Sequence, residues 1–223
     1  MKRARGSMSP KLFEKIVKDA SRCKVGLINL QYVGEPLMDE RLFERIRLIK
    51  KYGLNVMFHT NGSLMDEEKS RLILETGVNV VGISIDALSK ETYKKIRRGL
   101  PFEKVVENVL NLMEMKKREK ASLPVVKVNY VILDENIHEV KGFYDFWRNK
   151  VDHVNVTFAH DWAGQFSVSS DPSIHSKDGL PFLNPCNMLW REMVVFHDGR
   201  VPLCCSDYEG NVIMGDLRTQ GIM

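Results

Sequence analysis

The sequence predicts an α/β protein built on a parallel sheet, and three observations lead to this class. Short apolar segments alternate with longer segments of helical periodicity from Ser9 to about residue 160. Strands separated by helices are joined by right-handed crossovers, so they run parallel. Polar residues follow several of the expected strands directly, and this is where α/β sheets and βα barrels place ligands.

The individual elements follow from their start and stop signals. The expected strands cover residues 25–30, 54–58, 79–85, 125–133 and 153–158. The expected helices begin at Ser9 and continue with residues 39–51, 66–76, a short stretch after Ser89, 102–117 and 137–150. Ser9, Asp39 and Ser89 have side chains that can cap a helix N-terminus, and Pro10 suits a first turn. Gly77 is a typical helix stop.

Four polar residues stand just after the expected strands, namely Glu35, Thr60, Asn61 and Asp86. Each of them alone also fits a turn, because Gly-Glu-Pro and Asn-Gly are good turn formers in any protein. The carboxyl ends of parallel strands meet at one edge of the sheet, so the four residues converge. Their convergence favours a binding site over simple turn chemistry.

Three cysteines near the C-terminus form a second candidate site. Asp198-Gly199 predicts a hairpin that folds the segment ending in Cys204 back along the segment that follows Cys186. Thiolates gathered in this way are typical of soft-metal or iron–sulfur ligation. In a regular ribbon Cys204 and Cys205 point to opposite faces, so at most one of them readily joins Cys186.

Plainer interpretations of the cysteines stay open. An unpaired cysteine is often a small buried hydrophobic residue, and Cys23 at the end of a helical pattern fits that description. A disulfide is disfavoured, because the chain has only four cysteines in 223 residues and no secretory signal at its start. The cysteine usage indicates a reducing cytoplasm.

Composition excludes several classes of protein. Lys and Arg number 33 and Asp and Glu 29, so the net charge of +4 is too small to indicate nucleic-acid binding. No apolar run approaches the roughly 20 residues of a membrane span. The hydrophobic content of 43% fits a globular chain, and residues 161–185 change character to a Gly-, Ser- and Pro-containing linker.

Several segments, in this order, resemble a known family. Gln31-Tyr-Val-Gly34-Glu35-Pro36-Leu37 resembles the Gly-Gly-Glu-Pro loop of radical S-adenosylmethionine (SAM) enzymes, with Val33 in place of the first glycine. Thr60-Asn61-Gly62 and Ile83-Ser84-Ile85-Asp86 resemble the ends of two later strands of that family. Tyr93-Lys-Lys-Ile-Arg97 resembles its next segment. Cys186, Gly199 and Cys204 resemble the opening of the auxiliary-cluster (SPASM or twitch) motif that some members carry.

The resemblance implies a fold and a division of the chain. We expect a partial βα (TIM-like) barrel with parallel strands over residues 1–160, which lacks the family's first strand and cluster motif. A linker over residues 161–185 would follow. Residues 186–223 would form a truncated C-terminal β-hairpin domain of the auxiliary-cluster type.

The resemblance also implies site residues. The backbone of the Gly34 loop would hold the methionyl amino group of SAM, and Ser84 would lie near its carboxylate or ribose. Arg97 would meet the carboxylate with paired, charge-assisted hydrogen bonds. The expected SAM-binding set is Gly34, Glu35, Pro36, Thr60, Asn61, Ser84, Asp86 and Arg97. The expected metal ligands are Cys186, Cys204 and Cys205.

The family reaction is the reductive cleavage of SAM to a 5′-deoxyadenosyl radical, with SAM and [4Fe–4S] clusters as cofactors. The resemblance implies an electron donor such as flavodoxin or ferredoxin and leaves the substrate open, with a peptide or protein as one class. The three-cysteine signature of the catalytic cluster is absent from the 223 residues, and the chain stops before the remaining auxiliary cysteines are expected. We therefore interpret the sequence as an incomplete radical SAM/SPASM oxidoreductase.

Two other classes remain open at this stage. The chain could be a non-catalytic SAM- or iron–sulfur-binding module that acts with a partner. It could also bind zinc through Cys186, Cys204 and a nearby His197 or Asp207.

Overall fold

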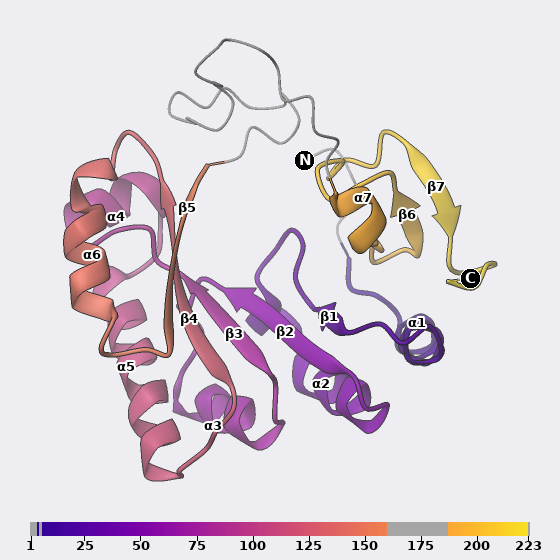
Figure 1. Ribbon diagram of the computed structural model, residues 1–223, viewed down its shortest axis with the longest axis horizontal. Coiled ribbons are helices and arrows are strands. Elements are labelled where there is room, and N and C mark those ends of the chain that lie inside the picture. Colours follow the sequence, from indigo (N-terminus) through magenta and orange to yellow (C-terminus); the bar gives the residue numbers. More distant parts are fainter. Residues whose placement is uncertain (1–3, 5, 160–186, 223) are drawn as a thin grey trace. The chain divides into compact units, whose positions relative to one another are not determined.

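The computed structural model describes residues 4, 6–159 and 187–222 of the chain (Figure 1). Contacts divide the chain into two compact units. The larger unit comprises residues 26–158, and the smaller comprises residues 1–25 together with 159–223. None of the described helices is long and apolar enough to cross a membrane.

The larger unit is built on a parallel sheet of five strands whose order in space is their order in sequence. The strands are β1 (Leu27–Asn29), β2 (Asn55–Thr60), β3 (Val80–Ser84), β4 (Val125–Ile132) and β5 (His153–Phe158). The parallel α/β class predicted from the sequence is confirmed. Among the described strands β1 pairs only with β2, so it forms one edge of the sheet.

Helices connect each strand to the next, and Figure 1 shows α2, α3, α5 and α6 on one face of the sheet. The helical elements of this unit are η1 (Pro36–Met38), α2 (Leu42–Lys51), α3 (Glu67–Glu75), α4 (Lys90–Ile96), α5 (Phe102–Arg118), η2 (Ile137–Glu139) and α6 (Val140–Trp147). The helix expected to begin at Asp39 begins three residues later. Asp39 ends the short helix η1, and its carboxylate accepts a hydrogen bond from Arg41 N at 3.0 Å.

The core lies between the sheet and these helices. Along β2 and β4, alternate side chains are completely buried, including Phe58 and Tyr130. The helices contribute buried residues such as Ile46, Val109 and Phe143, and the rings of Tyr130 and Phe143 have centroids 4.5 Å apart. Each large apolar side chain buried in this way contributes about 1.5–3 kcal/mol. The residues between them along each strand point to the opposite face of the sheet, which is only half-buried and carries the polar side chains.

The smaller unit contains α1 (Pro10–Arg22), α7 (Met188–Arg191), β6 (Arg200–Pro202) and β7 (Ile213–Asp216). Ser9 caps α1 as expected, accepting a hydrogen bond from Leu12 N at 3.3 Å. The strands β6 and β7 form an antiparallel hairpin. Lys15 of α1 donates a hydrogen bond to the Gln220 carbonyl, so α1 contacts the segment after this hairpin.

The predicted turn at Asp198-Gly199 is present, but the strand pairing differs from the one expected. Phe196 N donates to the Arg200 carbonyl at 2.9 Å, which closes the turn, and Gly199 has a φ of +93°. Regular pairing then forms between β6 and the later strand β7, while the segment before the turn is not a strand. A Cβ at Gly199 would lie 2.9 Å from Arg218 Cγ, so side chains from beyond β7 close the space above the turn.

Candidate functional site

A polar pocket of about 330 Å³ lies where β1, β2 and β3 end. It is lined by residues at the ends of these strands, in the loops that follow them and at the end of α4. The residues that line it are Gln31, Gly34, Glu35, His59, Thr60, Asn61, Ser84 and Arg97. All of them belong to the larger unit. The sequence places them there because the carboxyl ends of parallel strands share one edge of the sheet.

Glu35 fixes the first loop of the pocket to the end of β2. Its Oε1 atom accepts hydrogen bonds from Thr60 Oγ1 at 2.6 Å and from Leu37 N at 3.1 Å. Its Oε2 atom accepts from Asn61 N at 2.7 Å. The preceding residue, Gly34, has a φ of +133°, a backbone angle that residues other than glycine rarely adopt, and its backbone is exposed. Glu35 therefore shapes the loop, and Gly34 presents open backbone to the pocket.

The turn after β2 is equally constrained. Gly62 N donates to Thr60 Oγ1 at 3.0 Å, and Ser63 N donates to Asn61 Oδ1 at 2.9 Å. The Gly62 carbonyl accepts a hydrogen bond from Asn108 Nδ2 of α5 at 2.8 Å. A Cβ at Gly62 would lie 3.0 Å from Ile83 Cγ2, so a larger residue would push the turn away from β3. These bonds hold the pocket wall in place before any ligand arrives.

Arg97 enters the pocket from the end of α4 and is paired with Asp86. Its Nε donates to Asp86 Oδ2 at 2.9 Å, and its terminal nitrogen Nη2 donates to the same oxygen. The other oxygen, Asp86 Oδ1, accepts from Val131 N at 2.8 Å. Asp86 is buried, with 3% of its surface exposed, so its carboxylate supports Arg97 rather than facing the pocket.

Tyr93 lies one helical turn before Arg97 on the same helix. Burial raises the pKa of Tyr93 to about 12, with Arg97 lowering it and Asp86 raising it further. Its hydroxyl is fully buried and has no hydrogen-bond partner among the described residues. The ring packs against Phe102, with centroids 5.2 Å apart. Tyr93 thus anchors α4 in the core and leaves Arg97 at the surface of the pocket.

Six of the eight residues that the sequence assigned to SAM binding line this one pocket. They are Gly34, Glu35, Thr60, Asn61, Ser84 and Arg97. The other two, Pro36 and Asp86, are buried and do not line it. Sequence reasoning missed Gln31 and His59 as lining residues. His59 could have been found, since it alternates with the buried residues Phe58 and Thr60 and must point to the opposite face.

His59 is the titratable lining residue whose environment is most unusual. Burial lowers its pKa, and the nearby ammonium of Lys127 lowers it further. Both effects disfavour the imidazolium form, so His59 is a neutral imidazole at neutral pH. A neutral imidazole can donate from one nitrogen and accept at the other.

The expected metal site is described only in part. Cys186 lies outside the described residues. Cys204 and Cys205 are half-buried and form no disulfide. They occupy a turn after β6, so the strand alternation expected to point them to opposite faces does not apply. Their thiols, on adjacent residues of one turn, are the donor type that iron–sulfur clusters require.

The residues considered as additional zinc ligands have other roles. Asp207 Oδ1 accepts from Asn211 N at 2.8 Å and Asp207 Oδ2 accepts from Val212 N at 2.9 Å. A Cβ at Gly6 would lie 2.6 Å from His197 Cδ2, which shows that the imidazole packs against the glycine backbone. Within the described ranges, no group of three His, Cys, Asp or Glu residues is arranged to hold a metal ion.

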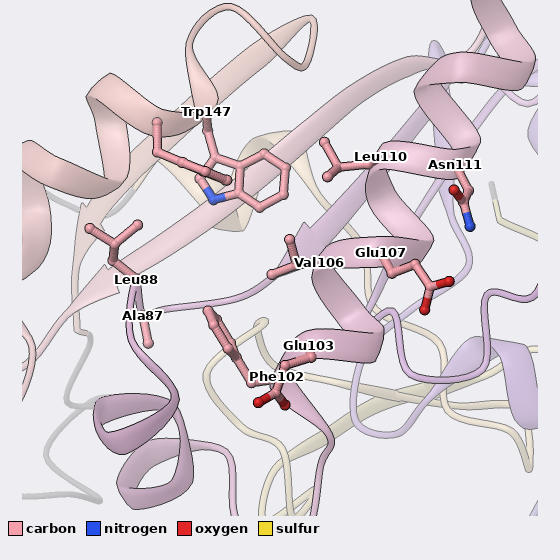
Figure 2. Close-up of a pocket in the computed structure, with 10 residues that line it drawn as sticks. Ala87, Leu88, Phe102, Glu103, Val106, Glu107, Leu110, Asn111 and Trp147 are labelled. Carbon is pink, nitrogen blue, oxygen red and sulfur yellow. The ribbon is translucent and has the colours of Figure 1, made fainter.

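A second pocket of about 470 Å³ has a different character. It lies between α5 and α6, and Figure 2 shows Leu88, Val106, Leu110 and Trp147 gathered around it. The two carboxylates at its margin form ion pairs, Glu103 with Lys90 and Glu107 with Lys104. This pocket therefore offers apolar surface and no free charged group, and we assign the chemistry to the polar pocket.

Comparison with known families identifies the class of protein. Residues 1–146 match the radical SAM superfamily, and residues 186–223 match the SPASM iron–sulfur cluster-binding domain. The chain belongs to the radical SAM superfamily and carries a SPASM domain at its C-terminus. These families bind SAM and [4Fe–4S] clusters, which are the cofactors expected from the sequence.

Sequence similarity to individual proteins is consistent with this family assignment. The chain is 34% identical over 152 residues to a probable GTP 3′,8-cyclase of Methanothermobacter thermautotrophicus, covering 67% of this chain and 47% of that protein. It is 28% identical over 207 residues to an uncharacterized protein of Treponema pallidum, covering 86% of this chain and 56% of that one. The chain thus spans about half the length of these relatives.

Solved structures share the fold. Streptococcus suis SuiB bound to its precursor peptide SuiA superimposes with a TM-score of 0.79 at 12% identity, covering 100% of this chain and 58% of SuiB. BtrN in complex with AdoMet and 2-DOIA gives a TM-score of 0.57 at 17% identity, covering 98% of this chain and 69% of BtrN. At these identities the likeness concerns the fold.

Proposed function

We propose that the chain is the core of a radical SAM/SPASM oxidoreductase and that the polar pocket is its SAM site. The observation that carries the proposal is the convergence of Gly34, Ser84 and Arg97 on one preformed pocket. SAM presents a methionyl ammonium, a carboxylate and a ribose. Exposed backbone at Gly34 suits the ammonium, and the guanidinium of Arg97 suits the carboxylate.

Each residue of the pocket then has a distinct part in binding. Arg97 keeps donors that Asp86 does not use, because a guanidinium carries five N–H groups. The Ser84 hydroxyl can donate to or accept from the ribose or carboxylate. Glu35 and the turn over residues 60–62 hold the loops in place, which reduces the entropy lost when the ligand binds.

Two kinds of iron–sulfur site are implied by the family. A bound [4Fe–4S] cluster supplies the electron that cleaves SAM to methionine and a 5′-deoxyadenosyl radical. Cys204 and Cys205, together with Cys186, are the residues of this chain that we propose for the auxiliary cluster. The low cysteine usage, four in 223 residues, is the ground on which we propose a reducing compartment such as the cytoplasm.

The relatives suggest two substrate classes. The cyclases related to this chain are named for a nucleotide, and the solved structure with the highest TM-score of those cited was determined with a peptide. The electron donor would be a small redox protein of the flavodoxin or ferredoxin type. Non-catalytic SAM binding remains the alternative function of the same pocket.

The test is the formation of 5′-deoxyadenosine from SAM after anaerobic reconstitution with iron and sulfide and reduction with dithionite. The cysteines of the 223 residues stand at positions 23, 186, 204 and 205, so no three have the spacing of the family signature. We expect these residues alone to give no product, and a longer in-frame chain that adds such a signature to give it. If the longer chain binds SAM and forms none, the pocket serves binding without catalysis.

A further inference from the structure

The face of the sheet opposite the helices carries two rows of polar residues directly beside the polar pocket. Strand register places His59, Gly82, Lys127 and His153 in one row across β2 to β5. Ser84, Asn129 and Asn155 form the next row. Paired residues of adjacent strands share a face, so these side chains stand on the face opposite the helices.

The two polar rows lie at the end of the sheet that holds the pocket. In the next row toward the strand N-termini, the residues of β2, β3 and β4 are apolar (Met57, Val80 and Val125), and β1 contributes Asn29. His59 and Ser84 belong both to the rows and to the pocket lining. The polar surface therefore continues from the pocket onto the face of the sheet, as expected for a second ligand placed beside the first.

Gly82 is the gap around which these side chains converge. A Cβ at Gly82 would lie 2.0 Å from His59 Cδ2 and 2.9 Å from Asn129 Nδ2. The imidazole and the amide thus reach over the glycine from the strands on either side. Gly82 has no left-handed backbone angle, so glycine is required here for space rather than for conformation.

The polar groups of this cluster have donor capacity that the described protein does not use. Within the described part of the chain, no carboxylate lies within 4 Å of Lys127 Nζ, and no hydrogen-bond partner contacts the His59 ring. Asn155 Nδ2 donates to Asn129 Oδ1 at 3.1 Å. This bond does not use the N–H donors of Asn129 Nδ2. Lys127 and His59 are half-buried, so their polar groups stay accessible to a ligand, and an anionic group is the partner that pairs best with the ammonium.

We propose that Lys127, His59 and Asn129 bind an oxyanion group, a carboxylate or a phosphate, of the substrate. The proposal rests on the proposed function, because it places the substrate beside the SAM pocket. Lys127 supplies the positive charge, and His59 donates from its neutral ring. Asn129, fixed by Asn155, donates from its amide. The unpaired charge of Lys127 is thereby neutralised only when the substrate is present.

The test is calorimetric titration of the 223-residue chain with two probes, inorganic pyrophosphate and tricarballylate, with and without SAM. We expect at least one probe to bind, and the probe that binds identifies a phosphate or a carboxylate as the group recognised. Lys127→Met should weaken that binding about tenfold or more, since a hydrogen bond to a charged group is lost. Lys117→Met, which removes the same charge from an exposed position of α5, should change it less than about twofold.

A second variant covers the case in which Lys127→Met fails to fold. His59→Leu should also weaken the probe, because it removes a donor from the same cluster. The affinity for SAM is measured for wild type and Lys127→Met, and we expect it to be equal, which separates this proposal from the SAM assignment. The proposal is overturned if neither probe binds, or if both Lys127→Met and His59→Leu bind the probe as tightly as wild type.

Discussion

Glu35 and Asp86 illustrate at the residue scale why a polar residue in a motif need not contact the ligand. Both carboxylates are occupied by protein donors, Glu35 by Thr60 and Asn61 and Asp86 by Arg97 and a backbone N–H. Removing either would leave donors of the pocket wall unpaired. Their effect on binding is therefore indirect, through the position of the loops and of Arg97.

His59 gives a pH-dependent prediction at the same scale. Its pKa is lowered in the folded state, so the unfolded chain binds a proton more readily. Its contribution to stability is present above the unfolded value of about 6.5 and declines as the pH falls below that value. Urea unfolding of wild type and His59→Gln from pH 5 to 8 should show a stability difference that changes below about pH 6.5.

His153→Gln is the matched control for His59→Gln, because His153 is an exposed histidine on β5. We expect His153→Gln to keep the pH profile of wild type. Parallel profiles for wild type and His59→Gln over the whole pH range would show that the environment of His59 has been misjudged.

At the scale of elements, the start of α4 is tied to the segment before α6 by Glu139. Its Oε1 accepts from Ser89 Oγ at 2.5 Å and from Thr92 Oγ1 at 2.8 Å, and its Oε2 accepts from Leu88 N at 2.7 Å. Burial raises the pKa of Glu139, but these hydrogen bonds outweigh it and lower the pKa overall. The helix that carries Arg97 is thereby fixed at its N-terminus.

We therefore expect Glu139→Ala to lower the free energy of unfolding by about 2–3 kcal/mol, because several hydrogen bonds to one charged group are lost. The exposed Glu135→Ala on the same connection should change it by less than about 0.5 kcal/mol. Thermal or urea unfolding of both variants at neutral pH measures the difference. Equal stability of the two variants would mean that Glu139 is not the tie between these elements.

Most of the helices and strands could be predicted from the sequence. The strands and helices were predicted because apolar periodicity and caps such as Ser9 and Ser89 are local signals. The pairing of β6 with β7 was not, because Asp198-Gly199 specifies a turn but not which later segment competes for the strand edge. Likewise the ion pair of Arg97 with Asp86 joins a strand end to a helix end, and no local pattern encodes it.

At the scale of the whole molecule, family membership and pocket geometry lead to the same site by separate routes. The family implies SAM. Six of the residues expected to bind it, from segments as far apart as Gly34 and Arg97, line the same pocket. His59 and Lys127 belong to no quoted motif. They come to lie in one row only through the strand register across β2, β3 and β4. The division of the chain into domains at residues 160 and 186 stays a prediction.

The central claim, that the polar pocket binds SAM, is tested most directly by calorimetric titration of the 223-residue chain with SAM. Ser84→Val is the informative variant, because it removes one pocket hydroxyl from a strand without unpairing a buried charge, which Arg97→Met would do. We expect wild type to bind SAM, Ser84→Val to bind it about three- to tenfold more weakly, and the exposed Thr157→Val on β5 to match wild type. Equal affinity of Ser84→Val and wild type, or no binding by either, would contradict the assignment.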